Sequence, residues 1–271
     1  MSARVIAFYG GYSTQTMTSR TSRLKNLIVV ACHAPFKGTT LTVPAQPEGD
    51  EAWVLQSFQI GEPPLYIAHI KRGVELLKAD PGALLIFSGG YTRPEAGLRW
   101  SEAETYRAIA KRFDWWSTAE RAASTDLEAR TAVEDYSRDS FENLLFSLCR
   151  FQQVVGQYPH RVTLVSWAFK RERFGLHREA IRFPTQRFSF DGFNEPIGLD
   201  AALRGEAVTM EAFGKNHYGS DGTVAEKRIA RNPFKREHDF RSCPDMGEFF
   251  QFMEEPSNRD RQYPARIPWE E

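Results

Sequence analysis

Cysteine is scarce in this chain of 271 residues: Cys32, Cys149 and Cys243 lie far apart in the sequence. Three cysteines with no CxxC spacing give no disulfide framework, zinc knuckle or redox pair. We therefore expect a reducing compartment, and the cytoplasm as the location. The histidines lack HxxxH and HxH spacing, so no metal site is predicted.

Long apolar runs and net charge are also missing. No run approaches the roughly 18–20 residues of a membrane span, so no membrane partner is expected. Lys+Arg and Asp+Glu both number 35, which gives no reason to expect a nucleic-acid partner. Residues 1–47 contain no acidic residue. We expect 1–25 to be a disordered extension, with a mitochondrial transit peptide, and hence a mitochondrial location, as the alternative.

The residues that are present fit a globular protein with a well-filled core, since 41% are apolar and 13% aromatic. Continuous apolar runs predict buried parallel strands, and alternation predicts an edge strand. The predicted strands are 26–34, 83–90, 130–137, 161–168 and, at the edge, 186–193. Helical spacing of apolar residues predicts helices within 63–82 and at 101–113, 139–156 and 170–183.

This alternation of strands and helices predicts an α/β fold, a three-layer α/β/α sandwich around a mainly parallel, Rossmann-like sheet. The domain covers 26–195. Residues 196–271 are expected to be an extension packed on the core, with helices near 200–212 and 244–254. In such sheets, ligands bind beyond the carboxyl ends of the strands, so polar residues there are candidates for a site.

Two predicted strands end in such residues. His33 follows the first, and the stretch from Ser88 to Arg93 follows the second. Gly89 and Gly90 let backbone amides approach an anion, and a hydroxyl adds a donor. GxGxxG and GxxxxGK[ST] are both absent, which disfavours a dinucleotide fold in the narrow sense and a P-loop. The absence of GxSxG disfavours an ordinary α/β-hydrolase.

The stretch "VEDYSRDSFENL" combines a helix start with unexplained polar residues. Asp139 or Ser140 can cap the helix, and Glu142 completes a capping box with Asp139. Capping leaves Glu134, Arg138 and Asn143 unexplained. A carboxylate, a guanidinium, a hydroxyl and an amide at one helix start can bind a sugar- or phosphate-bearing ligand.

Two further helix starts carry charges. Ser101 and Glu104 form a capping box, which leaves Glu102 either as a site residue or as favourable charge at a helix N-terminus. Lys170 and Arg173 share a helix face where cations oppose the macrodipole. They are expected to hold an anion or to pair with a carboxylate, with a solvated basic face as the alternative.

The remaining candidates are weaker. His69 is interpreted as a surface or core residue of its helix, and Cys149 as a packed thiol. Cys32 and His33 are adjacent on a strand and point to opposite faces, which disfavours a Cys–His nucleophile pair.

Five segments in order carry a resemblance to a family: "LIVVACHA", "LLIFSGGYTR", "SEAETY", "VEDYSRDSFENLLFS" and "LVSWAFKRERF". Over 26–195 the chain resembles the SanA/YdcF-like proteins, a domain of unknown function, and most the eukaryotic, especially fungal, branch. "YGSDGTVAEKRIARNPF" extends the resemblance to about residue 234. Two departures are Cys32, where the branch usually has glycine, and Lys170, where many bacterial members have histidine.

The resemblance implies a three-layer α/β core with a polar pocket at the strand ends. We expect an enzyme, a hydrolase or group transferase, that acts on a small anionic, nucleotide- or sugar-bearing metabolite. The alternatives are a non-catalytic protein that binds a nucleotide-like ligand such as S-adenosylmethionine, and an interaction protein whose polar cluster ties loops together. No cofactor or oligomeric state is predicted. The expected catalytic residues are His33, Glu102, Glu142 and Lys170. The expected ligand-binding residues are Ser88, Gly89, Gly90, Thr92, Arg93, Glu134, Arg138, Ser140, Asn143 and Arg173.

Overall fold

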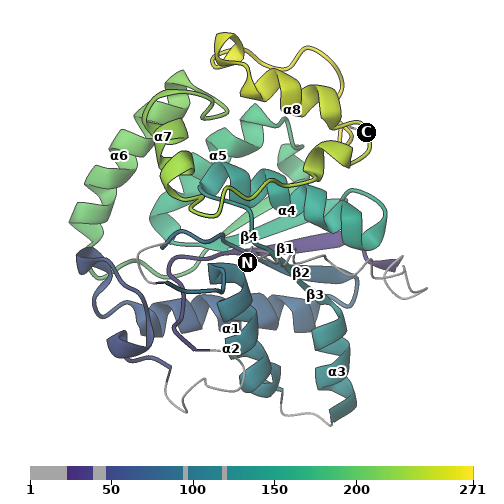
Figure 1. Ribbon diagram of the computed structural model, residues 1–271. Helices are drawn as coiled ribbons and strands as arrows, with labels where there is room; N and C mark the ends of the chain where they lie inside the picture. Colours follow the sequence, from purple (N-terminus) through teal and green to yellow (C-terminus); the bar gives the residue numbers. More distant parts are fainter. Residues whose placement is uncertain (1–22, 39–46, 94–96, 118–120, 271) are drawn as a thin grey trace, which may run out of the picture.

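A five-stranded sheet forms the centre of the computed structural model, which describes residues 23–38, 47–93, 97–117 and 121–270 (Figure 1). Most of the expected N-terminal extension lies outside these residues. The sheet has the order β3-β2-β1-β4-β5, and each neighbouring pair is parallel. The predicted α/β, Rossmann-like fold is therefore confirmed. The strands are β1 (Asn26–Ala31), β2 (Ala83–Ser88), β3 (Thr131–Glu134), β4 (Arg161–Ser166) and β5 (Phe188–Gly192).

Side chains of the central strands are buried on both faces, which explains their continuous apolar runs. In β1, Leu27 and Val29 belong to one core cluster, and Ile28 and Val30 belong to the other. This alternation follows from the two-residue period of a strand. The sheet therefore separates two cores.

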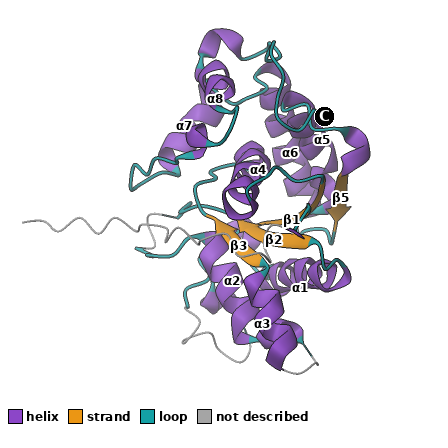
Figure 2. Cartoon of the chain, turned by 90° about the vertical axis from the view of Figure 1, so that its right-hand side faces the viewer, coloured by secondary structure: helices purple, strands orange, loops and turns teal. Residues whose placement is uncertain are grey.

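Helices cover both faces of the sheet (Figures 1 and 2). One face packs against α1 (Pro63–Ala79) and α2 (Glu102–Arg112), with α3 (Arg121–Ala129) beside them. The other face packs against α4 (Ser140–Val155) and α5 (Arg171–Ala180). None of the predictions includes α3.

Residues beyond 196 extend the second layer. They form α6 (Leu199–Lys215), α7 (Gly222–Ala230) and α8 (Gly247–Glu254), of which α7 is missing from the predictions. Phe213, Phe249 and Trp269 are buried in the same core cluster as the helices α4 and α5. The C-terminal part thus completes the core on this face of the sheet (Figure 1).

The strand predicted at 130–137 ends earlier, at Glu134. The Glu134 carboxylate accepts hydrogen bonds from the backbone amides of Tyr136 (2.7 Å) and Ser137 (2.9 Å). These bonds from the two following amides to the side chain stabilise a turn that leads the chain away from the sheet. The residues from 135 to 139 therefore form a loop at the carboxyl edge.

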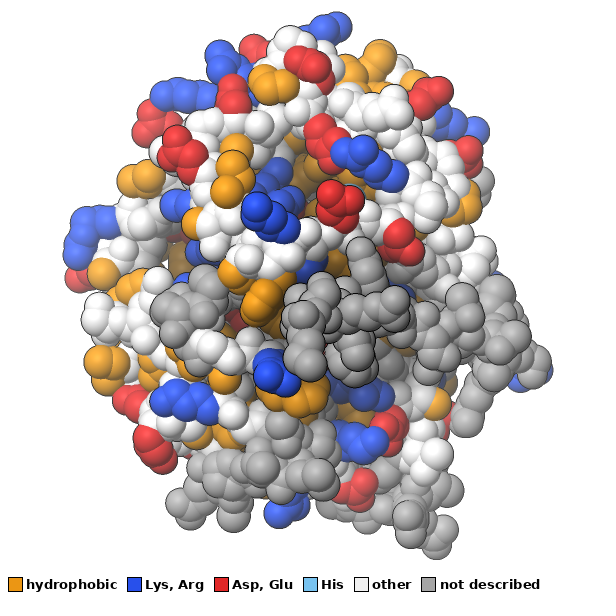
Figure 3. All heavy atoms as spheres, viewed as in Figure 1, with side chains coloured by type: hydrophobic (Ala, Val, Ile, Leu, Met, Phe, Trp, Pro, Cys, Tyr) orange, Lys and Arg blue, Asp and Glu red, His pale blue; other side chains and the backbone are white. Residues whose placement is uncertain are grey.

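Charged side chains of both signs are interspersed on the face seen in Figure 3, in keeping with the balanced composition. In the part of the chain that the structure describes, no helix is both long and apolar enough to cross a membrane.

Candidate functional site

A cavity of about 520 Å³ lies beyond the carboxyl ends of the strands. Its lining includes residues that follow β1 and β4, the neighbours between which the strand order reverses. Such a switch point is where open parallel sheets bind their ligands, and this volume suits a small metabolite. Helices α6 and α7 supply the lining from the C-terminal part of the chain.

Most of the predicted site residues come together here. The predicted residues that line the cavity are His33, Gly89, Thr92, Arg93, Glu102, Arg138, Ser140, Asn143, Lys170 and Arg173. Ser88, Gly90, Glu134 and Glu142 do not line it. Three of these four are buried polar side chains that hold the loops around the cavity in place.

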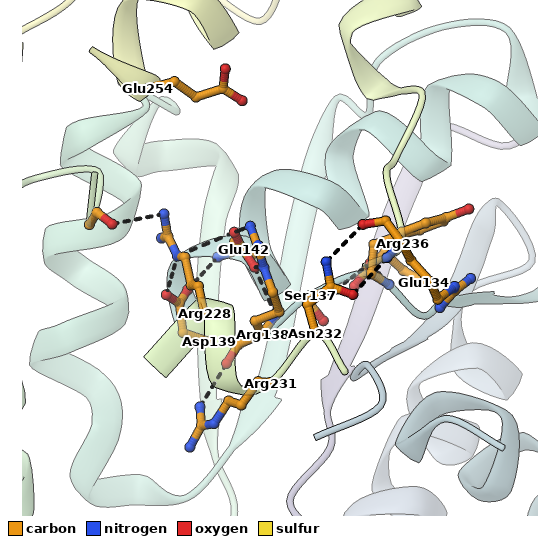
Figure 4. A network of polar contacts seen from close by, with 12 residues as sticks. Glu134, Ser137, Arg138, Asp139, Glu142, Arg228, Arg231, Asn232, Arg236 and Glu254 are labelled. Carbon is orange, nitrogen blue, oxygen red and sulfur yellow. Dashed lines mark hydrogen bonds and ion pairs between the residues drawn. The ribbon is translucent and has the colours of Figure 1, made fainter. Parts of the chain in front are cut away.

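Glu142 is one of the buried residues, at 1% exposure. Its carboxylate accepts a hydrogen bond from the Arg138 backbone amide (2.8 Å) and forms ion pairs with the guanidinium groups of Arg138 (2.5 Å) and Arg228 (3.2 Å) (Figure 4). The cap of α4 is Asp139, which accepts from the Glu142 amide (3.0 Å). Two cations and an amide therefore engage the Glu142 carboxylate, which does not line the cavity, and its catalytic role stays a prediction.

The anion-binding role expected for the glycine amides is corrected. The amide of Gly89 donates to the Glu134 carbonyl (3.0 Å), and that of Gly90 donates to the Ser137 carbonyl (2.9 Å). A Cβ atom at position 90 would lie 2.5 Å from the Ser137 oxygen, so glycine is needed for the close approach of two backbones.

Glu134 organises the loop beneath the cavity. Ser88 donates to its carboxylate at 2.5 Å, in addition to the two loop amides. The Asn143 side chain donates to the Ser88 carbonyl (3.1 Å) and to the Ser137 hydroxyl (2.8 Å). Burial raises the pKa of Glu134 to about 7 despite these bonds. Ser88 and Glu134 are therefore supports for the site, and Asn143 both lines the cavity and anchors its wall.

Among the charged residues of the lining, lysine and arginine outnumber aspartate and glutamate. Burial and the nearby Arg173 lower the pKa of Lys170 to about 7. Arg173 forms an ion pair with Glu206 of α6 (2.8 Å), whereas no ion pair of Lys170 is found among the described residues. The Arg93 guanidinium donates to the Thr92 carbonyl (3.3 Å), and the Arg231 guanidinium donates to the Arg138 carbonyl (2.6 Å). A carbonyl carries no net charge, so these two hydrogen bonds do not neutralise either arginine.

Glu102 is one of the carboxylates that line the cavity, and it is the first residue of α2. Ser101 and Glu104 form the predicted capping box, so Glu102 is not needed for it. Its carboxylate accepts a hydrogen bond from the Thr92 hydroxyl. Burial raises its pKa above the usual range, so the group can exchange a proton closer to neutral pH.

His33 belongs to a chain of hydrogen bonds that the sequence does not reveal. Its Nε2 lies 2.9 Å from Nδ1 of His69, and Nε2 of His69 contacts the Phe193 carbonyl oxygen. His69 is completely buried in α1, and the ring of Trp167 stacks on His33 with centroids 5.0 Å apart. The sequence shows His69 among the apolar residues of α1, but its partners lie far away in the chain, so the sequence alone does not show this role.

Hydrogen-bond chemistry fixes the tautomers of the pair. A carbonyl oxygen only accepts, so Nε2 of His69 donates to Phe193. Burial lowers the pKa of His69 to about 4, which keeps it neutral and leaves Nδ1 as an acceptor for His33. Burial also lowers the pKa of His33 well below its usual range. His33 is then neutral with a lone pair on Nδ1.

Three arginines of the C-terminal part hold the loop between β3 and α4 (Figure 4). Arg228 pairs with Asp139 (2.7 Å), Arg231 donates to the Arg138 carbonyl, and Arg236 pairs with Asp135 (2.9 Å). Their only sequence signal is the basic run that follows "YGSDG". Sequence reasoning missed them because their partners lie about 90 to 100 positions away.

Comparison with known proteins finds a relative over most of the chain. The sequence is 25% identical to the uncharacterized protein YOR238W of Saccharomyces cerevisiae, over 90% of this chain and 96% of the yeast protein. No family model matches the chain. No solved structure matches it.

No group of three or more His, Cys, Asp or Glu residues suited to a metal ion occurs in 23–38, 47–93, 97–117 or 121–270. The side chains of the cavity offer cations that can hold an anion, a neutral histidine that can accept a proton, and a carboxylic acid that can donate one.

Proposed function

We propose that this protein is an enzyme that hydrolyses or transfers a group of a small anionic, nucleotide- or sugar-bearing metabolite. The observation that carries the proposal is the meeting of His33, Glu102 and Lys170 in one cavity at the switch point of the sheet. All three have pKa values shifted by burial, a pattern typical of catalytic groups.

Each group has a role in this proposal. Arg93, Lys170 and Arg231 attract and orient the anion. His33 accepts a proton at Nδ1 from the attacking hydroxyl or water, and His69 holds the ring in that tautomer. Glu102, with its raised pKa, donates a proton to the leaving group.

Family and location belong to the same proposal. We propose that the chain is a SanA/YdcF-like protein of the fungal branch, on the five sequence segments that carry the resemblance. We propose the cytoplasm as the site of action, on the sequence argument from free cysteines.

A thermal-shift screen with phosphate, sugar phosphates, nucleotides and S-adenosylmethionine tests the proposal. A ligand at about 100 times its Kd stabilises the fold by about 2.7 kcal/mol. Ligands that stabilise are then tested for turnover, with Glu102→Gln as the catalytic variant. Turnover that Glu102→Gln abolishes without loss of binding supports the assigned roles. Binding without any turnover points to the non-catalytic alternative, and no stabilisation by any anion contradicts both.

Sulfate keeps its charge across neutral pH, so the pH dependence of sulfate binding reports the charge of Lys170. The lysine is cationic below a pKa of about 7 and neutral above it, so sulfate affinity should fall as the pH rises from 6 to 8. Lys170→Met should bind sulfate more weakly at pH 6 and lose this dependence. An unchanged dependence in the variant would assign it to another group.

A further inference from the structure

One face of α6 is made of small and apolar residues that line the cavity. Ala201, Gly205, Val208 and Ala212 recur at helical spacing, and all four are lining residues. Within α6 only Glu206 and Phe213 are buried. The helix therefore leaves most of this face to the cavity instead of packing it into the core.

A buried polar atom beside this face lacks a protein partner. Glu206 is 8% exposed and lines the cavity, and its Oε1 has no hydrogen-bond partner among the described residues. Its Oε2 is occupied by Arg173. A buried acceptor without a donor costs free energy, so a hydroxyl of a bound ligand is its natural partner.

The apolar face is extended rather than compact. From Ala201 to Ala212 the helix rises about 16 Å at 1.5 Å per residue, which is longer than a single ring system. Large apolar side chains remain exposed at the same cavity: Phe58 is 63% exposed and Val208 is 66% exposed. An extended apolar chain would cover both.

The same cavity is also lined by the cations Arg93, Lys170 and Arg231. Apolar side chains and cations in one cavity complement a ligand with one anionic end and one apolar end. We propose that the cavity binds a single-chain amphiphile, an alkyl or acyl chain that carries an anionic, phosphate-type head group. This inference rests on the proposed function, because the head group occupies the same anion site.

Calorimetry on the full chain tests the inference with probes that share a phosphate head group and differ in chain length. The amphiphiles are used at concentrations at which they are monomeric. Decyl phosphate should bind at least about 100-fold more tightly than methyl phosphate, because nine further methylene groups leave water. Decyltrimethylammonium, with the same chain and the opposite charge, should bind much more weakly than decyl phosphate. Equal affinities for the two phosphates would overturn the inference.

A matched pair of variants tests whether the alkyl chain of the ligand lies along α6. A Cβ atom at Gly205 or Gly214 of α6 meets no atom within 4 Å, and only Gly205 lines the cavity. Both changes to leucine favour the helix, so neither is expected to impair folding. Gly205→Leu should weaken the binding of decyl phosphate by about tenfold or more, because the leucine side chain overpacks the cavity. Gly214→Leu should leave this binding unchanged. Equal effects of the two variants would contradict the assignment of the α6 face.

The outcomes separate this inference from the proposed function. If methyl phosphate binds through Lys170 and the chain adds no affinity, only the amphiphile is wrong. If decyl phosphate binds equally well to Lys170→Met, the chain alone is recognised and both the anion site and the inference fail. Cosedimentation with vesicles that contain or lack a lysophosphatidic acid then tells a membrane-held amphiphile from a free one, and either source supports the inference.

Discussion

The pair of His33 and the buried His69 is the part of the cavity that can act as a base. The deduced arrangement has a proton on Nε2 of both His33 and His69, with the lone pair of His33 on Nδ1. Nuclear magnetic resonance of the imidazole nitrogens at pH 7 should show both rings neutral and in the Nε2–H tautomer. His69→Phe removes the acceptor and should release this preference in His33. Finding Nδ1–H in wild-type His33 would contradict the proposed base.

Glu134 should make stability depend on pH in an unusual direction. Its folded pKa of about 7 lies above the ordinary glutamate pKa of 4.5, so between these values the folded state binds more protons than the unfolded state. Its contribution is therefore lost as pH rises from about 4.5 to 7, by roughly 3 kcal/mol at 1.36 kcal/mol per pKa unit.

Comparison with Glu134→Gln isolates that contribution, since the buried histidines shift stability in the opposite direction as they titrate. The difference in unfolding free energy, wild type minus variant, should fall between pH 5 and pH 7 in urea denaturation. A difference that is constant across this range would show that Glu134 stays charged in the folded protein.

Most of the residues that sequence reasoning singled out line the cavity, because parallel topology brings strand ends together. It did not predict the ion pairs of Glu142, because a carboxylate one turn into a helix looks the same whether it faces a ligand or an arginine from elsewhere. Arg228 is 86 positions beyond Glu142 in the sequence, and no local pattern predicts that pairing. The role of His69 was missed for the same reason, since its partners are His33, two residues after β1, and Phe193, the residue after β5.

Among the elements, the strands and apolar helices were predictable and two helices were not. The apolar residues of α1 and α4 recur at helical spacing over several turns, and this pattern made both helices predictable. The helix α7 buries only Val224 and Arg228, so one of its two inward positions is charged and the apolar period is absent. In α3 the sequence "RAASTDLEA" is similarly poor in large apolar residues. Hydrophobic periodicity cannot detect helices that are held by ion pairs or by a single contact.

The helix α7 is held to the site by Arg228, whose guanidinium is 7% exposed between Asp139 and Glu142. Replacing it with methionine leaves two buried carboxylates with less compensation, and removing one partner of a buried pair costs about 3–5 kcal/mol. We expect Arg228→Met to lower the unfolding free energy by about that amount in urea. Lys215→Met, which breaks the exposed pair with Glu211, is the control and should change stability little. Similar losses of unfolding free energy in the two variants would show that the buried ion pairs of Arg228 stabilise the fold no more than the exposed pair of Lys215 does.

At the scale of the molecule, the C-terminal part is needed to close the core over the sheet. Trp269 is 1% exposed and its indole donates to the Ile181 carbonyl at the end of α5 (2.7 Å). Arg182 donates to the Tyr263 carbonyl (2.9 Å) and pairs with Glu270 (2.8 Å). These contacts join the last residues of the chain to the layer that carries Lys170 and Arg173.

Trp269→Ala tests whether this closure stabilises the whole molecule. Truncating a buried aromatic side chain costs about 3–5 kcal/mol, because the transfer free energy is lost and a cavity remains. Trp100→Ala is the matched control, since Trp100 is 44% exposed and should cost far less. Urea denaturation should show one cooperative transition whose midpoint falls strongly for Trp269→Ala alone. If the two variants unfold alike, or if Trp269→Ala produces a separate early transition, the C-terminal residues stabilise only themselves and the sheet folds without them.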